Sequence, residues 1–355
     1  MSGGIEAEAP GKVVLLGEYA VLEGVGGLAM AVDRHARVNL RVLPGSSGRI
    51  CALQLAIPPV CFELSPVGNM RWKTPHRGAF VTTAGLVERL LSDRIQRGAR
   101  LSGFELTIDT EALFMRRGNE MTKLGLGSSA ALTVAVDAAL RRAFPVSGEH
   151  VESFATRVER LRRTVCGVQG GHASGIDLAA SLAGGLVDYQ LRGDSVMLER
   201  RNLPKGLAMR FVWTGRPAST KMLLGHWAEA RRRNPAAVAG LIREMAASAS
   251  SGRRAVADND TAELVEQIGV YGRIMGKMND LMPIPVFSEA HRHAARGANR
   301  LGLVYKPCGA GGGDLGVAAS TDPDRLARYA RWLSGTGMMP LSLAVSQRGL
   351  WPHDE

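Results

Sequence analysis

The spacing of apolar and polar residues along the chain predicts a mixture of strands and helices. Apolar residues run from Val13 to Leu16 and again from Ala36 to Leu43, with Gly24, Gly26 and Gly27 between them, which predicts two strands joined by a tight loop. Helical spacing is found at 80–97, 128–144 and 150–166, and a strand is expected at 103–109. Pro and Gly are frequent in residues 44–79, which indicates short strands and a long loop.

The second half of the chain repeats this mixture after a polar stretch. Residues 191–206 are polar and contain Gly193, Pro204 and Gly206, so we expect one domain at 1–198 and another at 199–355. The second half predicts strands at 207–213, 301–305, 315–319 and 341–346, and helices at 219–233, 236–256, 260–280, 288–300 and 323–334. This order of elements predicts an α+β fold in two layers.

A glycine-rich stretch precedes the helix predicted at 128–144. It reads Lys123-Leu-Gly-Leu-Gly-Ser-Ser-Ala-Ala-Leu, and glycines without a Cβ let the backbone approach a ligand closely. The serines at 128 and 129 are good caps for the helix, which ends at Pro145. Unpaired N–H groups at the start of a helix suit phosphates, whereas an ordinary capped helix is the alternative. The stretch matches neither the G-x-x-x-x-G-K-[ST] loop nor the dinucleotide G-x-G-x-x-G pattern.

Composition indicates an ordinary soluble protein. The chain has 355 residues, of which 45% are hydrophobic and 22% charged. No apolar run approaches the length of a membrane span and the first ten residues lack the features of a signal peptide, so we expect a cytoplasmic protein without membrane partners. The four cysteines form no C-x-x-C pair, which favours reduced thiols and argues against structural zinc.

The chain is basic, which favours an anionic partner. Its formal net charge is +11, and nucleic acid, a membrane surface and a small polyanion are the possible partners. The basic residues are scattered, and aromatic residues make up only 5% of the chain, so few stacking platforms exist. We therefore expect a small anionic ligand and no nucleic acid; solubility alone is the alternative reading of the charge.

Two further stretches carry candidate chemistry. In Ala9-Pro-Gly-Lys-Val-Val-Leu-Leu-Gly-Glu, Lys12 starts an apolar strand and Glu18 follows its end. Such a lysine is usually a solvated strand end, but in a cleft it would supply charge to a transferring phosphoryl group. In Lys306-Pro-Cys-Gly-Ala-Gly-Gly-Gly-Asp, four glycines lie between two predicted strands. They form either a flexible hairpin or a loop that packs closely against phosphate.

Together and in this order, these three stretches resemble the three motifs of the GHMP kinase superfamily of small-molecule kinases. Within it they are most similar to phosphomevalonate kinases, with mevalonate kinases next. The similarity rests on Gly17-Glu-Tyr-Ala-Val-Leu-Glu, on Lys123 ahead of the glycine loop, and on Trp213-Thr-Gly-Arg-Pro-Ala-Ser-Thr-Lys.

The resemblance implies a two-domain GHMP kinase fold, with a ribosomal-protein-like N-terminal domain that contains a left-handed β-α-β unit and a ferredoxin-like C-terminal domain. It implies ATP and Mg²⁺ as cofactors and 5-phosphomevalonate as the substrate, a small phosphorylated hydroxy acid. Lys12 and Asp177 would be catalytic, and Ser129 would bind the metal. The implied cofactor-binding residues are Lys123, Gly125, Leu126, Gly127, Ser128, Ser129 and Ala130. The implied substrate-binding residues are Lys12, Glu18, Tyr19, Lys123, Ser174, Asp177, Ser219, Thr220, Gly311 and Gly312.

Two positions depart from the superfamily pattern. Mevalonate kinases carry a metal-binding Glu about eleven residues before the catalytic Asp, and that offset falls on Cys166 here, so a second metal ligand is not identified. Cys308 stands where the family usually has Ser. Residues 44–100 carry no motif that points to a function.

Three functions remain open from the sequence. The first is phosphorylation of 5-phosphomevalonate, the second is a mevalonate kinase or another GHMP small-molecule kinase, and the third is a catalytically silent regulator that binds a nucleotide or another ligand. The sequence also leaves open whether the protein is a monomer or a homodimer.

Overall fold

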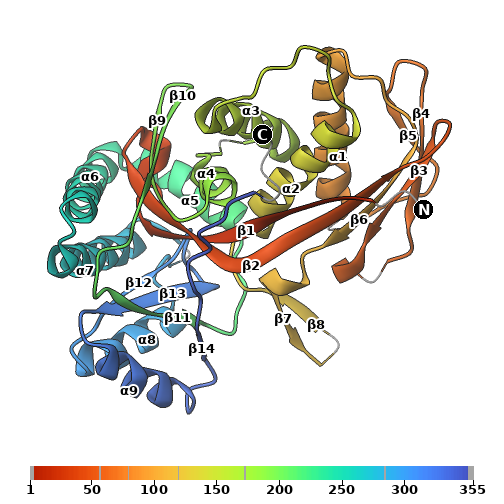
Figure 1. Cartoon of the computed structure of the whole chain (residues 1–355). Coiled ribbons are helices and arrows are strands. Elements are labelled where there is room, and N and C mark those ends of the chain that lie inside the picture. The colour runs from red at the N-terminus through yellow and green to blue at the C-terminus, as the bar shows by residue number, and fades with distance from the viewer. Residues whose placement is uncertain are drawn as a thin grey trace.

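The structure is a computed structural model that describes residues 4–350 except residues 56, 79, 119, 172 and 284. Figure 1 shows two sheets with their helices. Within the described residues the larger sheet has eight strands and the smaller one four, next to a short hairpin. The α+β class predicted from the sequence is confirmed.

The larger sheet is built around two long paired strands, β1 (Ile5–Leu16) and β2 (Gly27–Val42). Its other strands are β3 (Ser47–Ala52), β4 (Val60–Leu64), β5 (Met70–Trp72), β6 (Phe104–Asp109), β9 (Leu186–Arg192) and β10 (Ser195–Arg201). The strand order is β10-β9-β2-β6-β3-β4-β5, with β1 paired to β2, and β3 with β6 is the parallel pair among these. The hairpin of β7 (Phe114–Arg117) and β8 (Glu120–Lys123) leads into the glycine loop.

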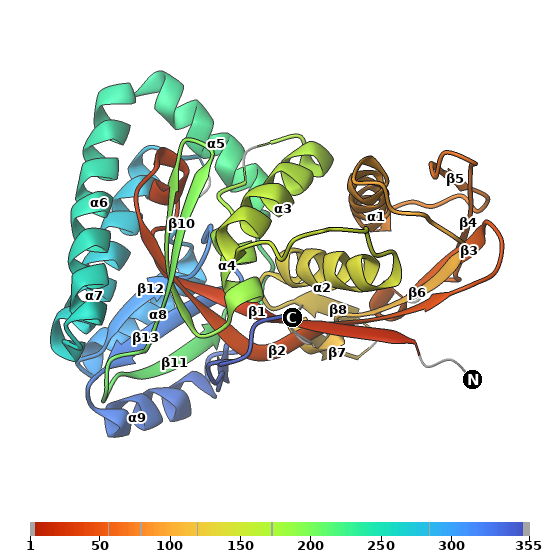
Figure 2. The same ribbon diagram turned by 45° about the horizontal axis from the view of Figure 1, so that its top comes forward.

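Helices cover one face of the larger sheet. They are α1 (Phe80–Gln96), α2 (Ser128–Ala143), α3 (Phe154–Gln169) and α4 (Ile176–Ala183), which lie together on one side of β1 and β2 (Figure 2). Their apolar faces pack with alternate strand residues such as Val14 and Ala29. The intervening residues, among them Val13, Leu15 and Met30, pack into a second core on the opposite face. Because both faces of the sheet are buried here, the sequences of β1 and β2 are continuously apolar in this part.

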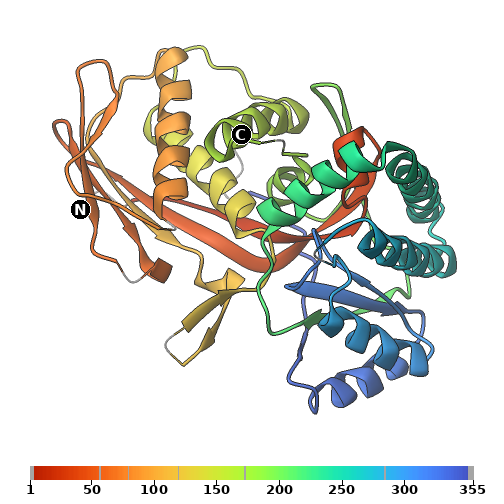
Figure 3. The same ribbon diagram turned by 180° about the vertical axis from the view of Figure 1, so that it is seen from behind.

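Within the described residues, the second half supplies the smaller sheet and five α-helices. The strands β12 (Val304–Pro307), β13 (Leu315–Ser320), β11 (Ala208–Trp213) and β14 (Met339–Leu341) are antiparallel and neighbours in that order. The helices are α5 (Thr220–Arg233), α6 (Pro235–Ala257), α7 (Thr261–Lys277), α8 (Glu289–Arg300) and α9 (Pro323–Leu333). Figure 3 shows α6 and α7 side by side, and α8 with α9 against the smaller sheet.

Several predicted elements differ from the observed ones. β1 and β2 are longer than predicted, and the strands β7, β8 and β10 were not expected. The predicted strand at 341–346 is wrong: β14 covers Met339–Leu341, and beyond it Val345 forms an isolated bridge to Val32 of β2. The helix predicted at 150–166 begins later, because the side chain of Ser153 accepts a hydrogen bond from Thr156 N and caps α3.

The chain crosses between the two halves more than once. The predicted boundary at residues 198 and 199 falls inside β10, which pairs with β9 of the larger sheet. Near its end the chain returns to that sheet, where Ser346 N donates to Ala31 O at 3.0 Å and Leu350 N to Leu182 O at 3.1 Å. The two-domain division and the handedness of the β-α-β unit stay predictions.

Candidate active site

The glycine loop and the strand β1 bring Lys12 into a cavity. Lys12 N donates to Leu126 O at 2.8 Å, so the loop lies directly beside β1. A Cβ on Gly127 would come within 2.7 Å of Lys12 Cε, and its φ of +73° also favours glycine. Gly127 therefore lets the lysine side chain pass across the loop, where it is only 7% exposed.

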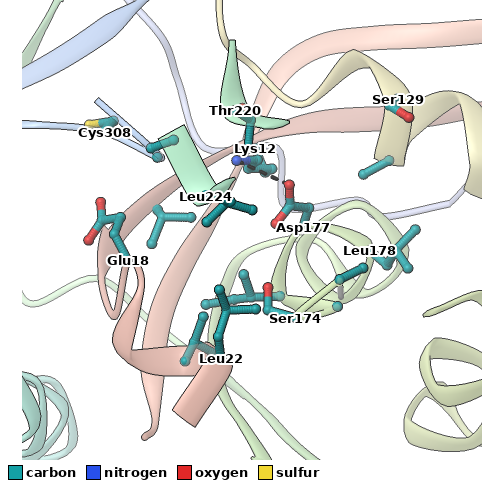
Figure 4. A pocket seen from close by; sticks show the side chains of 18 of the residues that line it. Lys12, Glu18, Leu22, Ser129, Ser174, Asp177, Leu178, Thr220, Leu224 and Cys308 are labelled. Carbon is teal, nitrogen blue, oxygen red and sulfur yellow. Dashed lines mark ion pairs between the residues drawn. The ribbon is translucent and has the colours of Figure 1, made fainter. Parts of the chain in front are cut away.

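Asp177 faces Lys12 from the start of α4. Its Oδ2 lies 3.3 Å from Lys12 Nζ, and Figure 4 shows the two side chains pointing toward each other. The N-cap of α4 is Gly175, with a φ of +84° and no side chain to cap the helix, and Asp177 lies in the first turn. Its contact with Lys12 therefore distinguishes Asp177 from an ordinary helix cap.

The cavity around this ion pair is lined by three predicted motifs and by the start of α5. Of the predicted site residues, its walls contain Lys12, Glu18, Tyr19, Gly125, Ser129, Ala130, Ser174, Asp177 and Thr220. Val14, Leu22, Leu178 and Leu224 add an apolar part, and Cys308, Gly309, Ala310 and Asp314 come from the third motif. One cavity thus combines charged groups, hydroxyls and apolar surface.

Seven of the predicted residues lie outside this lining. They are Lys123, Leu126, Gly127, Ser128, Ser219, Gly311 and Gly312. Leu126 points into the core, with 1% of its surface exposed. Gly312 N donates to Val286 O at 2.7 Å, and a Cβ on Gly311 would come within 2.5 Å of the same oxygen, so these two glycines pack behind the cavity wall. The roles assigned to all these residues stay predictions.

The serines at the start of α2 are not caps, contrary to the prediction. The N-cap is Gly127, and no side-chain cap is present there. Both serines lie in the first turn of the helix, where Ser129 is exposed toward the cavity. Ser219, by contrast, caps α5 by accepting a hydrogen bond from Met222 N at 3.3 Å.

Glu18 is held in a buried ion pair. Its carboxylate contacts Nζ of Lys306 on β12, and the side chains are 2% and 0% exposed, respectively. Burial raises the pKa of Glu18, although the positive charge of Lys306 opposes this effect. Glu18 reaches the cavity wall, but its main contact is with Lys306. The neighbouring Tyr19 donates from its hydroxyl to Ala310 O at 2.5 Å.

The two cysteines noted in the sequence have different environments. Cys166 lies on α3, and its Sγ accepts a hydrogen bond from Ala173 N at 3.2 Å, which fastens the turn before α4. Cys308 lines the cavity, and burial raises the pKa of its thiol to about 12, so the thiol stays protonated. Cys308 is therefore a neutral, weakly polar part of the wall.

Asp314 is a cavity residue that the sequence analysis did not single out. It follows the glycine loop between β12 and β13, and its carboxyl lies near Lys12 and Lys123. The only sequence signal was that an acidic residue ends the glycine run.

Comparison with known proteins finds a family model that matches part of the chain. Residues 83–185 match the family model of the GHMP kinases N terminal domain. With the fold and the ordered motifs, this match makes the chain similar to the GHMP kinases, and the predicted GHMP kinase fold is confirmed.

The relatives named by the comparison are kinases. The chain is 27% identical to a phosphomevalonate kinase of Streptomyces sp. (strain CL190) and 26% identical to a mevalonate kinase of Thermococcus sibiricus, in both cases over 98% of each chain. Its fold is similar to that of Streptococcus pneumoniae phosphomevalonate kinase in complex with phosphomevalonate and AMPPNP. That match has a TM-score of 0.71 and 21% identity, and it covers 96% of this chain and 99% of the other. In the part of the chain that is described, no helix is long and apolar enough to cross a membrane.

Proposed function

We propose that the chain is an ATP-dependent kinase that transfers the γ-phosphate of ATP to 5-phosphomevalonate and produces the 5-diphosphate. The ion pair between Lys12 and Asp177, beside the glycine loop and the start of α5, is the observation that carries this proposal. The similarity to phosphomevalonate and mevalonate kinases supports the same reaction class. The two identities are nearly equal, so the choice of substrate rests on the site.

The proposed reaction needs positioning and charge neutralisation. An oxygen of the substrate phosphate forms a bond to the γ-phosphorus, while the bond from that phosphorus to the β–γ bridging oxygen breaks and ADP leaves. A phosphate monoester has a second pKa of about 6, so at neutral pH the attacking oxygen is mostly deprotonated. Asp177 therefore mainly orients the substrate and accepts any remaining proton, while Lys12 stabilises the attacking oxygen.

The cavity also offers oxygen donors that fit Mg²⁺. Ser129 and Asp177 belong to its lining, and Mg²⁺ is commonly held by one or two protein oxygens together with substrate phosphates. Within the described residues, no group of three or more His, Cys, Asp or Glu could hold a metal by itself. A bound Mg²⁺ would neutralise part of the charge of the nucleotide phosphates.

Features near the cavity favour a phosphorylated substrate. Thr220 lines the cavity at the first residue of α5, where unpaired backbone N–H groups and the helix dipole attract anions. Lys123, at the end of β8, acts electrostatically on the same region through Asp314. A phosphorylated substrate would supply the anion that these groups attract, and an unphosphorylated substrate would not.

The test is a coupled ADP-release assay with mevalonate, 5-phosphomevalonate and homoserine. We expect the wild type to prefer 5-phosphomevalonate over mevalonate at least about tenfold. We expect Lys123→Ala to lower kcat/KM for it by about ten- to 150-fold, as for the loss of a charge-assisted hydrogen bond worth about 1.5–3 kcal/mol. Lys73→Ala, which removes an exposed lysine paired with Glu63, is the control and should change little.

Other outcomes assign the protein differently. If the wild type used mevalonate as well as 5-phosphomevalonate, and Lys123→Ala changed the activity on neither, the protein would be a small-molecule kinase of broader specificity. No ADP release with any of the three substrates, together with measurable nucleotide binding, would mean a catalytically silent binding protein.

A further inference from the structure

Asp314 has an unusual backbone conformation at the edge of the cavity. Its φ is +53°, one of few positive values among the described residues that are not glycine. The left-handed region is costly for most residues but tolerated by Asp and Asn. Asp314 N donates to Arg216 O at 2.7 Å, and Asp314 O accepts from Thr214 N at 2.9 Å, so the backbone is held from both sides. Strain maintained in this way is a feature of functional sites.

The side chain of Asp314 joins segments that are distant in the sequence. Its Oδ1 accepts a hydrogen bond from Ala218 N at 3.1 Å, directly before the N-cap of α5. A Cβ on Gly125 would come within 2.5 Å of Asp314 Cβ, and the φ of Gly125 is +80°, so only glycine fits there. The carboxyl is thus fixed between the glycine loop and the start of α5.

The charges around Asp314 come from two other elements. Lys12 on β1 and Lys123 on β8 favour its ionised form, as does the hydrogen bond from Ala218 N. Burial has the larger, opposite effect and raises the pKa of Asp314 to about 6. At pH 8 the carboxyl is therefore an anion inside a cavity that, under the proposed function, must bind phosphates.

We propose that Asp314 sets the affinity of this part of the cavity for phosphate: its fixed carboxylate partly neutralises Lys12 and Lys123 and repels an incoming phosphate. This inference rests on the proposed function, because it takes phosphate as the ligand. Before a ligand binds, the carboxylate lowers the net positive charge that Lys123 and Lys12, which is also paired with Asp177, give to this part of the cavity. It also keeps phosphate from binding too tightly, which matters for an enzyme that must release two highly charged products.

Asp314→Asn separates the charge from the geometry. Asn keeps an oxygen that accepts the hydrogen bond from Ala218 N, and it tolerates the left-handed conformation, but it carries no charge. Asn259→Ala is the matched control. Asn259 has a φ of +56°, and its Oδ1 accepts a hydrogen bond from Lys205 N at 3.1 Å; neither residue belongs to the cavity lining.

The experiment measures binding of inorganic phosphate and of 5-phosphomevalonate by calorimetry from pH 5 to pH 8, without ATP. At pH 8 we expect Asp314→Asn to bind both ligands about tenfold more tightly than the wild type, because a like charge has been removed from a partly buried site. Toward pH 5 the two proteins should converge, since Asp314 becomes protonated. Comparing the two proteins cancels the titration of the phosphate itself, which also occurs near pH 6.

The results separate this inference from the proposed function. Equal or weaker binding by Asp314→Asn at pH 8 would overturn the inference, even if the wild type is an active kinase. So would an absence of phosphate binding by every variant. Tighter binding by Asp314→Asn in a protein that phosphorylates none of the substrates would support the inference and reject the proposed reaction. Asn259→Ala should bind like the wild type, and a change there would mean that fold stability, not charge, controls binding.

Discussion

Lys12 and Asp177 form the contact on which the proposed chemistry depends most directly. The lysine is buried, while the aspartate side chain is 41% exposed and faces the cavity. We expect Lys12→Ala and Asp177→Asn each to lower kcat at least about a hundredfold, as for the loss of a positioned charge from a closed site. Steady-state kinetics with 5-phosphomevalonate checks this.

Lys277→Ala provides the control for these variants. Lys277 pairs with Glu244 at 2.6 Å on the protein surface, so its loss should leave kcat unchanged. Turnover near that of the wild type in both Lys12→Ala and Asp177→Asn would reject the proposed mechanism.

His291 on α8 supports the third glycine loop and makes stability depend on pH. One ring nitrogen lies 2.9 Å from Gly313 O and the other 2.9 Å from the Tyr305 hydroxyl. Burial lowers the pKa of His291 from 6.5 to about 4, although the Gly313 carbonyl opposes this effect. Between these values the unfolded chain binds the proton and the folded protein does not. The contribution of His291 to stability is therefore complete above pH 6.5 and is lost as the pH falls toward 4.

We expect this loss to reach about 3 kcal/mol and to appear as a fall in the urea midpoint between pH 6.5 and 4. His291→Gln should make the midpoint less dependent on pH over that range while lowering it at pH 7. His293→Gln, on the exposed side of the same helix, should follow the wild type. Parallel curves for wild type and His291→Gln would show that His291 already carries the proton in the folded state.

Ser129 distinguishes a ligand role from a structural one in α2. Because Gly127 is the N-cap and no side chain caps the helix, Ser129→Ala should change the melting temperature little. We expect it instead to lower kcat and to weaken the dependence of the rate on Mg²⁺ concentration. Ser153→Ala is the positive control for capping, since Ser153 does cap α3 and its loss should cost about 1 kcal/mol. A large loss of stability in Ser129→Ala with an unchanged Mg²⁺ dependence would contradict the metal role.

Helices were easier to predict than strands. Amphipathic spacing is a local signal, so the predicted limits of α1, α6 and α9 agree with the observed ones to within one residue. β10 was missed because it is a largely exposed polar strand that depends on its pairing with β9. β1 was predicted too short because its first residues mix apolar and charged side chains and include Pro10, which gives a weak local strand signal. These residues are held in the strand by their pairing with β2.

The sequence motifs predicted many of the residues that line the cavity, and Asp314 was missed for a physical reason. Lys12, Ser129 and Asp177 belong to motifs that can be read locally, and all three line the cavity. Asp314 was missed because its role depends on a hydrogen bond to Ala218, which lies 96 residues away. Contacts of this kind arise only when the smaller sheet is assembled.

The two halves of the protein share their interior. The strands β1 and β2 contribute alternate residues to a core with α2 and to a second core with α6, α7 and the smaller sheet. The last residues of the chain return to β2 and α4. The cavity lies where β1, the glycine loop before α2, α4, α5 and the loop after β12 meet, so its shape depends on both halves together.

The ion pair of Glu18 and Lys306 is a buried charge contact between these halves. Lys306 Nζ also lies 3.5 Å from Val14 O and 5.8 Å from the centre of the Tyr271 ring. Lys306→Met would leave the Glu18 carboxylate buried without its cation, which typically costs about 3–5 kcal/mol. We expect a corresponding fall in the urea midpoint at pH 7.5. The fall should be smaller near pH 5, because a carboxyl group whose pKa is raised by burial is protonated more readily there.

The double variant Glu18→Gln/Lys306→Met determines whether the unpaired charge of Glu18 causes the loss of stability in Lys306→Met. Without either charge, no buried ion is left unpaired, so the double variant should recover much of the stability lost by Lys306→Met alone. Lys277→Met breaks an exposed pair and should cost less than about 1 kcal/mol. If the double variant were as unstable as Lys306→Met alone, the loss would come from the packing of the Lys306 side chain against β1 and Tyr271. The charge of Lys306 would then not be what holds the two halves together.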